Sequence, residues 1–252
     1  MDSNLRQYRK RIDVAGIPVD AFSSEDLEKA VKEMLAGKKS CNIMLVSLRD
    51  IFLAKFNTEL RSNIERAELV LPISSSILFG AKFLKRMYIP ELYFPFDFVI
   101  KLLGVIENHG KSVYLVGGRK SVLRITESNI KSSFPGLNIV GRCAGFFPKE
   151  MEKNVVTAIK KSSPALILAG VGLSGGRHWI TRNTAAFNPG IMLWIGNSFD
   201  IFAGRRSRPA KTGGTRFAEK LGKVFRNPVK ILNAFIYVWY FFVLLYYRIR
   251  GL

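Results

Sequence analysis

The sequence has few of the residues that bind metal ions or form disulfides. It contains two histidines and two cysteines in 252 residues, and Cys41 and Cys143 are too far apart to form a CxxC pair. This scarcity argues against a conventional zinc site and a disulfide-stabilised scaffold. We expect both cysteines to be small buried residues in a reducing compartment. The sequence also lacks a D-x-D pair, so we expect no bound metal ion.

Acidic residues are scarce as well. Only 19 Asp and Glu stand against 39 Lys and Arg, which gives a formal net charge of +20. So many uncompensated cations favour an anionic partner: nucleic acid, a phosphorylated substrate or an acidic membrane surface. The N-terminal segment 1–11 is charged but no apolar run follows it, so we do not expect a cleaved secretory signal.

Short apolar segments alternate with amphipathic ones along the first 204 residues. This alternation predicts an α/β fold, with a parallel sheet covered by helices on both faces. We expect strands within 12–19, 42–46, 68–71, 113–116, 137–140, 165–171 and 191–195. We expect helices after residues 23–26 and at 50–66, 77–83, 95–108, 119–133, 148–161 and from 177. We therefore take 1–204 as one α/β domain and 205–252 as an appendage.

Two glycine-rich corners follow predicted strands. Gly172, Gly175 and Gly176 come directly after the apolar run 165–171, and Gly117 and Gly118 come after the run 113–116. Backbone amides at such strand-to-helix corners are suited to phosphate, and the second corner continues with the two cations of segment 119–120. The alternative for that corner is an ordinary glycine turn with solvated charges.

Residues 172–176 also match the G-x-S-x-G pattern of α/β-hydrolases around Ser174. That chemistry needs an acid and then a histidine later in the chain. The last histidine, His178, is only four residues on and in the same predicted helix. We therefore interpret Ser174 as a cap of that helix and the glycines as sites of close approach.

The composition changes after Gly204. Segment 205–230 is strongly basic, and segment 231–247 is almost wholly apolar. Phosphates of lipids or of a lipid-linked substrate explain both features, whereas nucleic acid explains only the first. We therefore expect no nucleic-acid partner and a membrane-associating helix at 228–248.

Three placements of this helix remain open. Its apolar run, about 25 Å long as a helix, is short for a bilayer core of about 30 Å. It could form a short tilted span, lie in the membrane interface, or pack in a protein core. The aromatic content and the preceding cations favour membrane contact. Burial within a homo-oligomer is the alternative.

Taken together, these segments resemble the bacterial WecG/TagA/CpsF glycosyltransferases over roughly residues 11–228. The resemblance lies in the order and spacing of several motifs. These are IDVAGIPVDAFSSEDLEKAV at 12–31, AELVLP at 67–72, VYLVGG at 113–118, FPGLNIVGRCAGFF at 134–147, PALILAGVGLSGGRHWI at 164–180, GNSFDIFAGRRSRP at 196–209 and FRNP at 225–228.

The resemblance implies a Rossmann-like fold with a basic, apolar C-terminal helical appendage that meets the membrane. It implies transfer of an N-acetylmannosamine-like sugar from a UDP-sugar to a polyprenyl-diphosphate-linked glycan acceptor, without a cofactor, for cell-surface polysaccharide. The expected location is the cytoplasmic face of the plasma membrane, in a peripheral or monotopic arrangement. We take as substrate-binding candidates the residues that match the family or line its glycine corners: Gly117, Gly118, Gly172, Ser174, Arg205 and Arg208.

Several polar positions of the family pattern are missing. The family's general base is thought to be an aspartate directly after the A-x-L-V-L-P strand, where this chain has Ile73. An isoleucine cannot accept a proton from a sugar hydroxyl. The T-x-N positions hold Leu45 and Ser47, and the polar residues that usually follow the glycine corner are also gone.

Two hypotheses follow from these losses. In the first, the chain is a divergent glycosyltransferase whose base lies elsewhere, with Asp50 and Asp200 as the candidates by position. In the second, it is a catalytically silent paralogue that binds a lipid-linked sugar or serves as a scaffold for a partner glycosyltransferase.

Overall fold

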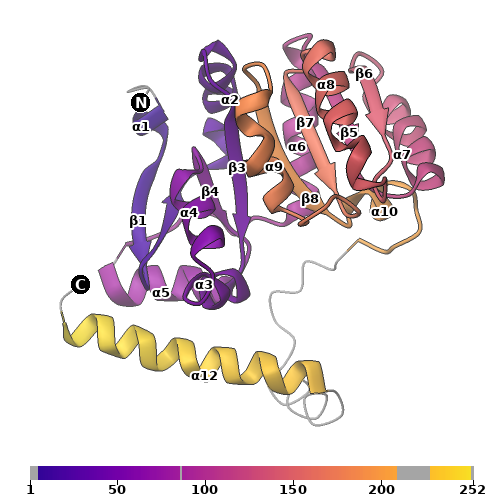
Figure 1. Ribbon diagram of the computed structural model, residues 1–252. Helices are drawn as coiled ribbons and strands as arrows, with labels where there is room; N and C mark the ends of the chain where they lie inside the picture. The colour runs from indigo at the N-terminus through magenta and orange to yellow at the C-terminus, as the bar shows by residue number, and fades with distance from the viewer. Residues whose placement is uncertain (1–4, 86, 209–227, 251–252) are drawn as a thin grey trace.

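The computed structural model describes residues 5–85, 87–208 and 228–250. Most of the basic segment predicted at 205–230 therefore lies outside the described residues. The described part contains a six-stranded sheet, a separate two-stranded hairpin and the helices that pack around them (Figure 1).

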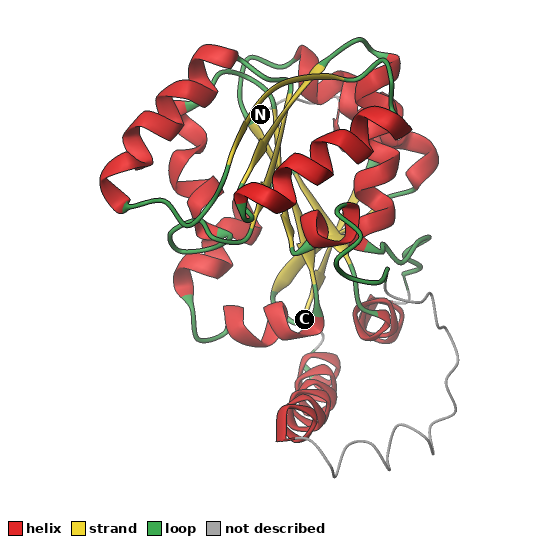
Figure 2. Ribbon diagram, turned by 90° about the vertical axis from the view of Figure 1, so that its right-hand side faces the viewer, coloured by secondary structure: helices red, strands yellow, loops and turns green. Residues whose placement is uncertain are grey.

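The large sheet is wholly parallel, in the order β4-β3-β8-β7-β5-β6. Its strands are β3 (Cys41–Val46), β4 (Leu69–Pro72), β5 (Ser112–Val116), β6 (Asn138–Cys143), β7 (Leu166–Gly170) and β8 (Ile191–Gly196). Helices cover both of its faces (Figure 2). The predicted Rossmann-like α/β class is confirmed.

The helices pack against the sheet through apolar stripes. In α2 the buried residues Leu27, Ala30, Val31 and Met34 recur at helical spacing. The helices are α1 (Leu5–Tyr8), α2 (Leu27–Ala36), α3 (Leu48–Ala54), α4 (Thr58–Arg66), α5 (Ser75–Lys85), α6 (Pro95–Asn108), α7 (Lys120–Ser133), α8 (Glu152–Ser162), α9 (His178–Asn183), α10 (Ser198–Phe202) and α12 (Pro228–Ile249). Short 3-10 turns occur at η1 (Ser24–Asp26), η2 (Lys149–Met151) and η3 (Thr184–Ala186).

The hydrophobic core is continuous on one face of the sheet and divided into two clusters on the other. On one face a single hydrophobic cluster joins α2, α6, α7 and α10 to the strands. The other face carries two clusters: one under β1, β2, α3, α4, α5 and α12, and one under α8 and α9. The division between these two clusters runs along β3 and β8.

The N-terminal segment forms an antiparallel hairpin, β1 (Lys10–Val14) and β2 (Ile17–Ala21), where the sequence predicted one short strand and a turn. The fully buried Asp20 holds this hairpin to the sheet. Its carboxylate accepts hydrogen bonds from Arg11 Nε at 2.8 Å and from the amide of Val70 in β4 at 2.7 Å.

The helix predicted over 50–66 is wrong as a single element. The chain forms α3 and α4 with a break at residues 55–57. Asn57 causes the restart, because its side chain accepts a hydrogen bond from the amide of Leu60 at 2.8 Å and so caps α4. The helix predicted from 148 similarly begins only at Glu152, after the turn η2. Cys143, predicted to be buried, is partly exposed.

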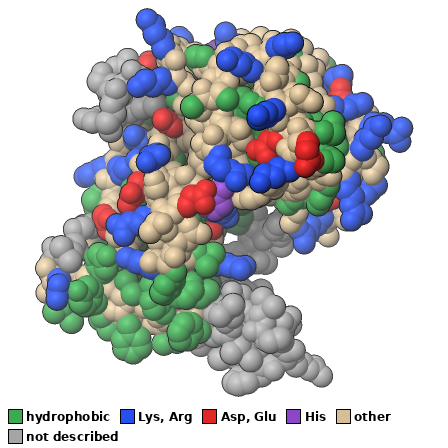
Figure 3. All heavy atoms as spheres, in the orientation of Figure 1, with side chains coloured by type: hydrophobic (Ala, Val, Ile, Leu, Met, Phe, Trp, Pro, Cys, Tyr) green, Lys and Arg blue, Asp and Glu red, His purple; other side chains and the backbone are tan. Residues whose placement is uncertain are grey.

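The C-terminal helix α12 packs against the domain along one side. It contacts α3 and α5, which follow the carboxyl ends of β3 and β4, so it lies on the carboxyl side of the sheet. Ile236, Tyr240 and Leu244 are buried against the domain. The other side of α12 is exposed and apolar, with Phe235, Tyr237, Val238, Phe241, Phe242, Tyr246 and Ile249. Hydrophobic side chains accordingly gather around α12 (Figure 3).

In the part of the chain that the structure describes, no helix combines the length and hydropathy needed to cross a membrane.

Candidate active site at the carboxyl edge of the sheet

The carboxyl edge of the sheet contains a switch point between two neighbouring strands. The segment after β5 continues as α7 on one face, and the segment after β7 continues as α9 on the other face. Ligands of open α/β sheets bind where neighbouring connections diverge in this way. Gly117 and Gly118 follow β5, and Gly172 follows β7, so the structure brings these predicted residues together.

Backbone hydrogen bonds join the glycine loops at this point. The amide of Gly117 donates to the carbonyl of Cys143 at 2.9 Å, and the amide of Gly118 donates to the carbonyl of Val171 at 2.6 Å. The amide of Phe146 donates to the carbonyl of Gly172, also at 2.6 Å. The amides of Gly117 and Gly118 therefore serve to hold loops together, and a phosphate at this edge would use other donors.

The glycines are needed because the loops approach closely. A Cβ on Gly117 would lie 2.6 Å from the carbonyl oxygen of Gly170, and one on Gly172 would lie 2.6 Å from the ring of Phe146. Gly172 also has a φ of +90°, a conformation that side chains disfavour. These residues set the shape of the edge.

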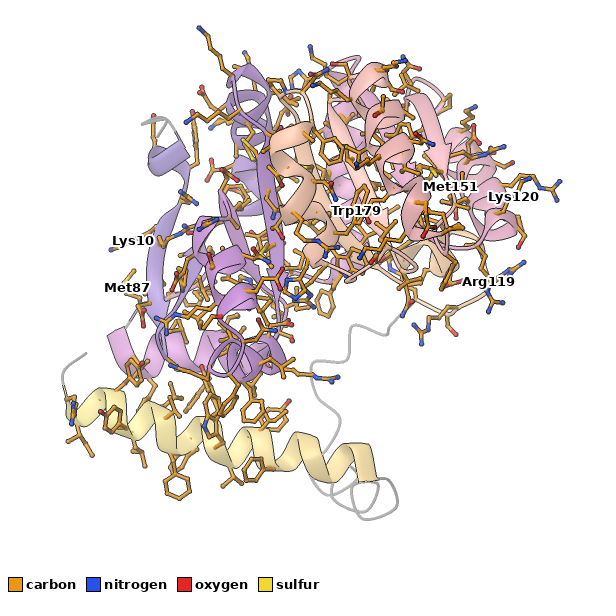
Figure 4. The ribbon with its side chains drawn as sticks, in the orientation of Figure 1. Lys10, Met87, Arg119, Lys120, Met151 and Trp179 are labelled. Carbon is orange, nitrogen blue, oxygen red and sulfur yellow. The ribbon has the colours of Figure 1, made fainter. Side chains whose placement is uncertain are left out.

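Positive charge lies at the start of α7, next to the glycine loops. Arg119 and Lys120 are exposed there, and their side chains point outward from the domain (Figure 4). Arg205 joins this group, because its Nη2 donates to Ser121 Oγ at 3.2 Å. Arg119, the residue before α7, makes no side-chain capping bond, so the positive end of the helix dipole adds to these cations.

Asp200 lies in α10 beside this basic group. Its backbone carbonyl accepts from the amides of Arg205 at 2.8 Å and Arg206 at 3.1 Å. Its neighbour Phe199 packs over Gly118 and Gly170. The Asp200 carboxylate is half-buried and forms no hydrogen bond or ion pair with a described residue. It is thus chemically available beside the predicted phosphate-binding residues.

Asp50, the other predicted candidate base, is fully engaged. Ser47 donates from its amide at 2.8 Å and from its hydroxyl at 2.7 Å to Asp50 Oδ2, which closes a capping box at the start of α3. Arg177 Nη1 lies 2.7 Å from Asp50 Oδ1. Both carboxylate oxygens are therefore occupied, and the side chain is 7% exposed. Its contacts are those of a residue that links α3 to the corner after β7.

Ile73, at the position of the family's expected acid, follows β4 and packs against the main core cluster. Its amide donates to the carbonyl of Val46 at 2.9 Å. The nearest polar side chains in sequence, Ser74 and Ser75, precede or begin α5. The end of β4 therefore presents an apolar residue to the edge of the sheet.

The remaining predicted binding residues differ in their surroundings. Arg208 forms an ion pair with Asp97 at the start of α6, and its guanidinium lies 5.5 Å from the ring centre of Phe96. Ser174 is exposed, and α9 begins only at His178. Ser174 is therefore not the cap of that helix, contrary to the sequence-based interpretation.

The sequence does not indicate that Arg177 and Asp97 form ion pairs at this edge. Each belongs to an ion pair with a residue far away in the chain. Among residues 5–85, 87–208 and 228–250, no group of three or more His, Cys, Asp or Glu side chains is arranged to hold a metal ion.

Comparison with known proteins gives one family and several relatives. The profile of the family described as "Glycosyl transferase WecG/TagA/CpsF family" matches residues 12–251. Similar curated proteins are named N-acetylglucosaminyldiphosphoundecaprenol N-acetyl-beta-D-mannosaminyltransferase. The protein from Bacillus spizizenii W23 is 24% identical over 71% of this chain and 68% of its own. The protein from Staphylococcus aureus NCTC 8325 is 22% identical over 81% of this chain and 80% of its own.

Proposed function

The chain belongs to the WecG/TagA/CpsF family of glycosyltransferases, and we propose that it transfers an N-acetylmannosamine-like sugar from a UDP-sugar to a polyprenyl-diphosphate-linked acceptor. The names of the relatives describe mannosaminyl transfer to N-acetylglucosaminyl-diphosphoundecaprenol. Both substrates in this proposal carry diphosphate, in agreement with a chain of formal net charge +20.

The observation that carries the proposal is the basic group at the start of α7. Arg205 is linked to Ser121, beside the exposed Arg119 and Lys120, at the edge where Gly118 and Gly172 meet. Arginine and the amides of a helix N-terminus are strong phosphate ligands. We place the donor diphosphate at this group, with Gly117, Gly118 and Gly172 shaping the loops and Ser174 and Arg208 at the rim.

We assign the proton-accepting role to Asp200. The reaction needs a base that removes the proton from the acceptor hydroxyl as the new glycosidic bond forms and the UDP group leaves. Asp200 has a carboxylate without a partner among the described residues, five residues before Arg205. Asp50 lacks this freedom because Ser47 and Arg177 hold both of its oxygens.

The appendage supports a membrane location for this chemistry. We propose that the exposed face of α12, which includes Phe235, Phe241 and Phe242, lies in the interface of the cytoplasmic leaflet. Because α12 packs on the carboxyl side of the sheet, the same edge faces the lipid-linked acceptor. The protein would be peripheral or monotopic, with 205–252 as the appendage to the domain 1–204.

The end of β4 favours a second candidate function. Ile73 occupies the position of the expected acid and is packed into the core. A chain without turnover could still bind a lipid-linked sugar diphosphate and act as a scaffold for a partner enzyme. This alternative shares the binding site with the first proposal and differs only in the absence of sugar transfer.

Calorimetric titration with UDP in detergent tests the binding site common to both functions. We expect saturable binding that Arg205→Gln weakens about tenfold, which is the loss of one charge-assisted contact. Lys32→Gln removes one positive charge from the exposed side of α2 and should leave the affinity unchanged. Absence of UDP binding at millimolar concentration would reject this placement of the donor.

A further inference from the structure

A cavity of about 470 Å³ lies between α4 and α9, at the division between the two core clusters of one sheet face. Figure 1 shows α9 in front of the sheet beside β3. The cavity lining includes residues 38–40 just before β3 and Pro189 just before β8. It therefore opens at the amino end of these strands, opposite to the carboxyl edge.

The floor of the cavity contains a polar side chain without a partner. Asn42 lies on β3, on the same sheet face as Met44, and is only 8% exposed. Its backbone is fixed by Glu68, whose Oε2 accepts from the amide of Asn42 at 2.6 Å. The side-chain amide of Asn42 makes no hydrogen bond with any described residue. Because Asn42 lines the cavity, its amide is open to a molecule that donates or accepts hydrogen bonds there.

The rim of the cavity is positive. Lys38, Lys39 and Arg66 line it, all three are exposed, and none forms an ion pair with a described residue. The one lining acid, Glu68, is partly buried and bonded to Asn42. An arginine with two lysines at one opening is suited to a phosphate group, which takes charge-assisted hydrogen bonds from them.

The inner wall adds groups that bind hydroxyls. The hydroxyls of Thr181 and Thr184 donate to carbonyls of their own helical turns at 3.0 Å and 2.8 Å. Their oxygens therefore remain able to accept hydrogen bonds from a ligand. Phe187 contributes an apolar surface. Phosphate-binding groups at the rim and hydroxyl-binding groups inside match a phosphorylated polyol.

We propose that this α4/α9 cavity binds a small sugar phosphate, with its phosphate on Lys38, Lys39 and Arg66 and its hydroxyls on Asn42 and the two threonines. The site is separate from the carboxyl edge and does not depend on the transferase activity. A smaller adjoining cavity is lined by Asn42, Asn63 and Arg177. Asn42 therefore lines both cavities. A ligand bound to Asn42 would lie next to the cavity that Arg177, the partner of Asp50, also lines.

Calorimetric titration of the full chain with N-acetylglucosamine 1-phosphate and with inorganic phosphate tests the site. We expect one-to-one binding of the sugar phosphate, about tenfold tighter than inorganic phosphate because the hydroxyls add contacts. The double variant Lys39→Gln/Arg66→Gln should lose the binding of both ligands. In the NMR spectrum, the side-chain amide signal of Asn42 should shift on addition of the sugar phosphate.

The matched control is Arg124→Gln/Lys153→Gln, which removes the same charge from exposed positions on α7 and α8. It should bind the sugar phosphate like the unmodified chain. Equal binding by the two double variants, or no saturable binding by the unmodified chain, would overturn the proposal. Asn42→Leu, checked for an unchanged melting temperature, should abolish the preference for the sugar phosphate. Equal affinity of the unmodified chain for the two ligands would overturn the assignment of a polyol.

Discussion

The guanidinium of Arg177 lies 2.7 Å from the carboxylate of Asp50. This ion pair joins the corner after β7 to the corner after β3, across the end of β8. Because the carboxylate is almost completely buried and also caps α3, the pair holds two loops of the carboxyl edge in place. We therefore propose a structural role for Asp50, which the sequence had suggested as a candidate base.

Asp50→Ala should therefore destabilise the protein strongly. The change removes the carboxylate half of the α3 capping box and leaves Arg177 without its anion, which together should cost about 2–4 kcal/mol in the free energy of unfolding. Urea denaturation measures this loss. Arg61→Gln, which breaks an exposed pair with Glu65, should cost less than about 0.5 kcal/mol. Equal losses for the two variants would contradict a structural role for Asp50.

The exposed face of α12 should control membrane binding. Phe241→Glu/Phe242→Glu replaces two exposed apolar side chains, each worth about 2 kcal/mol when buried in an apolar medium. We expect the double variant to lose co-sedimentation with vesicles that contain phosphatidylglycerol. Met151→Glu, at an exposed apolar position before α8, serves as the control and should sediment normally. Vesicle binding retained by the α12 variant at high salt would refute this role.

Docking of α12 should depend on a glycine in α5. A Cβ on Gly80 would lie 1.9 Å from Tyr240 Oη, so Gly80→Ala should displace α12 and lower stability by about 1–3 kcal/mol. Tyr240→Phe removes a buried hydroxyl that has no partner in the described structure, and it should be neutral or slightly stabilising. Combining the two changes should restore part of the loss, because the clash is mainly with the hydroxyl. If the effects of the two substitutions on the melting temperature simply add, the result would contradict a contact between position 80 and the Tyr240 hydroxyl.

Two tyrosines should make the protein lose stability in alkaline solution. Burial raises the pKa of Tyr93 and of Tyr240 above the ordinary value of about 10. In the unfolded chain each phenol releases its proton near pH 10, whereas the folded state keeps it. Their contribution to the free energy of unfolding is therefore complete below about pH 10. It is lost as the pH rises further, by about 1.4 kcal/mol per pH unit for each tyrosine.

Urea unfolding between about pH 9 and pH 11 measures this slope. Tyr240→Phe should make it shallower, and Tyr93→Phe should do the same while also losing the hydrogen bond from Tyr93 to the carbonyl of Phe22. An unchanged slope in both variants would show that these phenols are not protected in the folded state.

The strands were predictable because buried parallel strands are short apolar runs between turns. The break in the helix predicted at 50–66 was not recognised, although Asn57 is a good N-cap residue, since the apolar pattern continues across it. For the hairpin at 10–21, the sequence predicts only one short strand and a turn. Its turn uses Ala15 and Gly16, both with positive φ, and alanine gives no warning of that conformation.

The meeting of the two glycine corners was predictable, but the hydrogen bonds between them were not. Glycines directly after β5 and β7 must lie at the carboxyl edge of a parallel sheet. That the amides of Gly117 and Gly118 would bond to Cys143 and Val171 depends on loops distant in the chain. The partners of Asp50 and Arg208 are equally distant, because Arg177 and Asp97 reach them only through the fold.

Transfer of labelled N-acetylmannosamine from its UDP derivative to N-acetylglucosaminyl-diphosphate-polyprenol in phosphatidylglycerol vesicles tests the proposed function most directly. We predict that the unmodified chain forms the disaccharide product. Asp200→Asn should lower the rate about 100-fold or more with an unchanged melting temperature and unchanged UDP binding. If the unmodified chain binds UDP but forms no product, the result would contradict the proposed transferase activity and favour the scaffold function. Full activity of Asp200→Asn would contradict the assignment of the base.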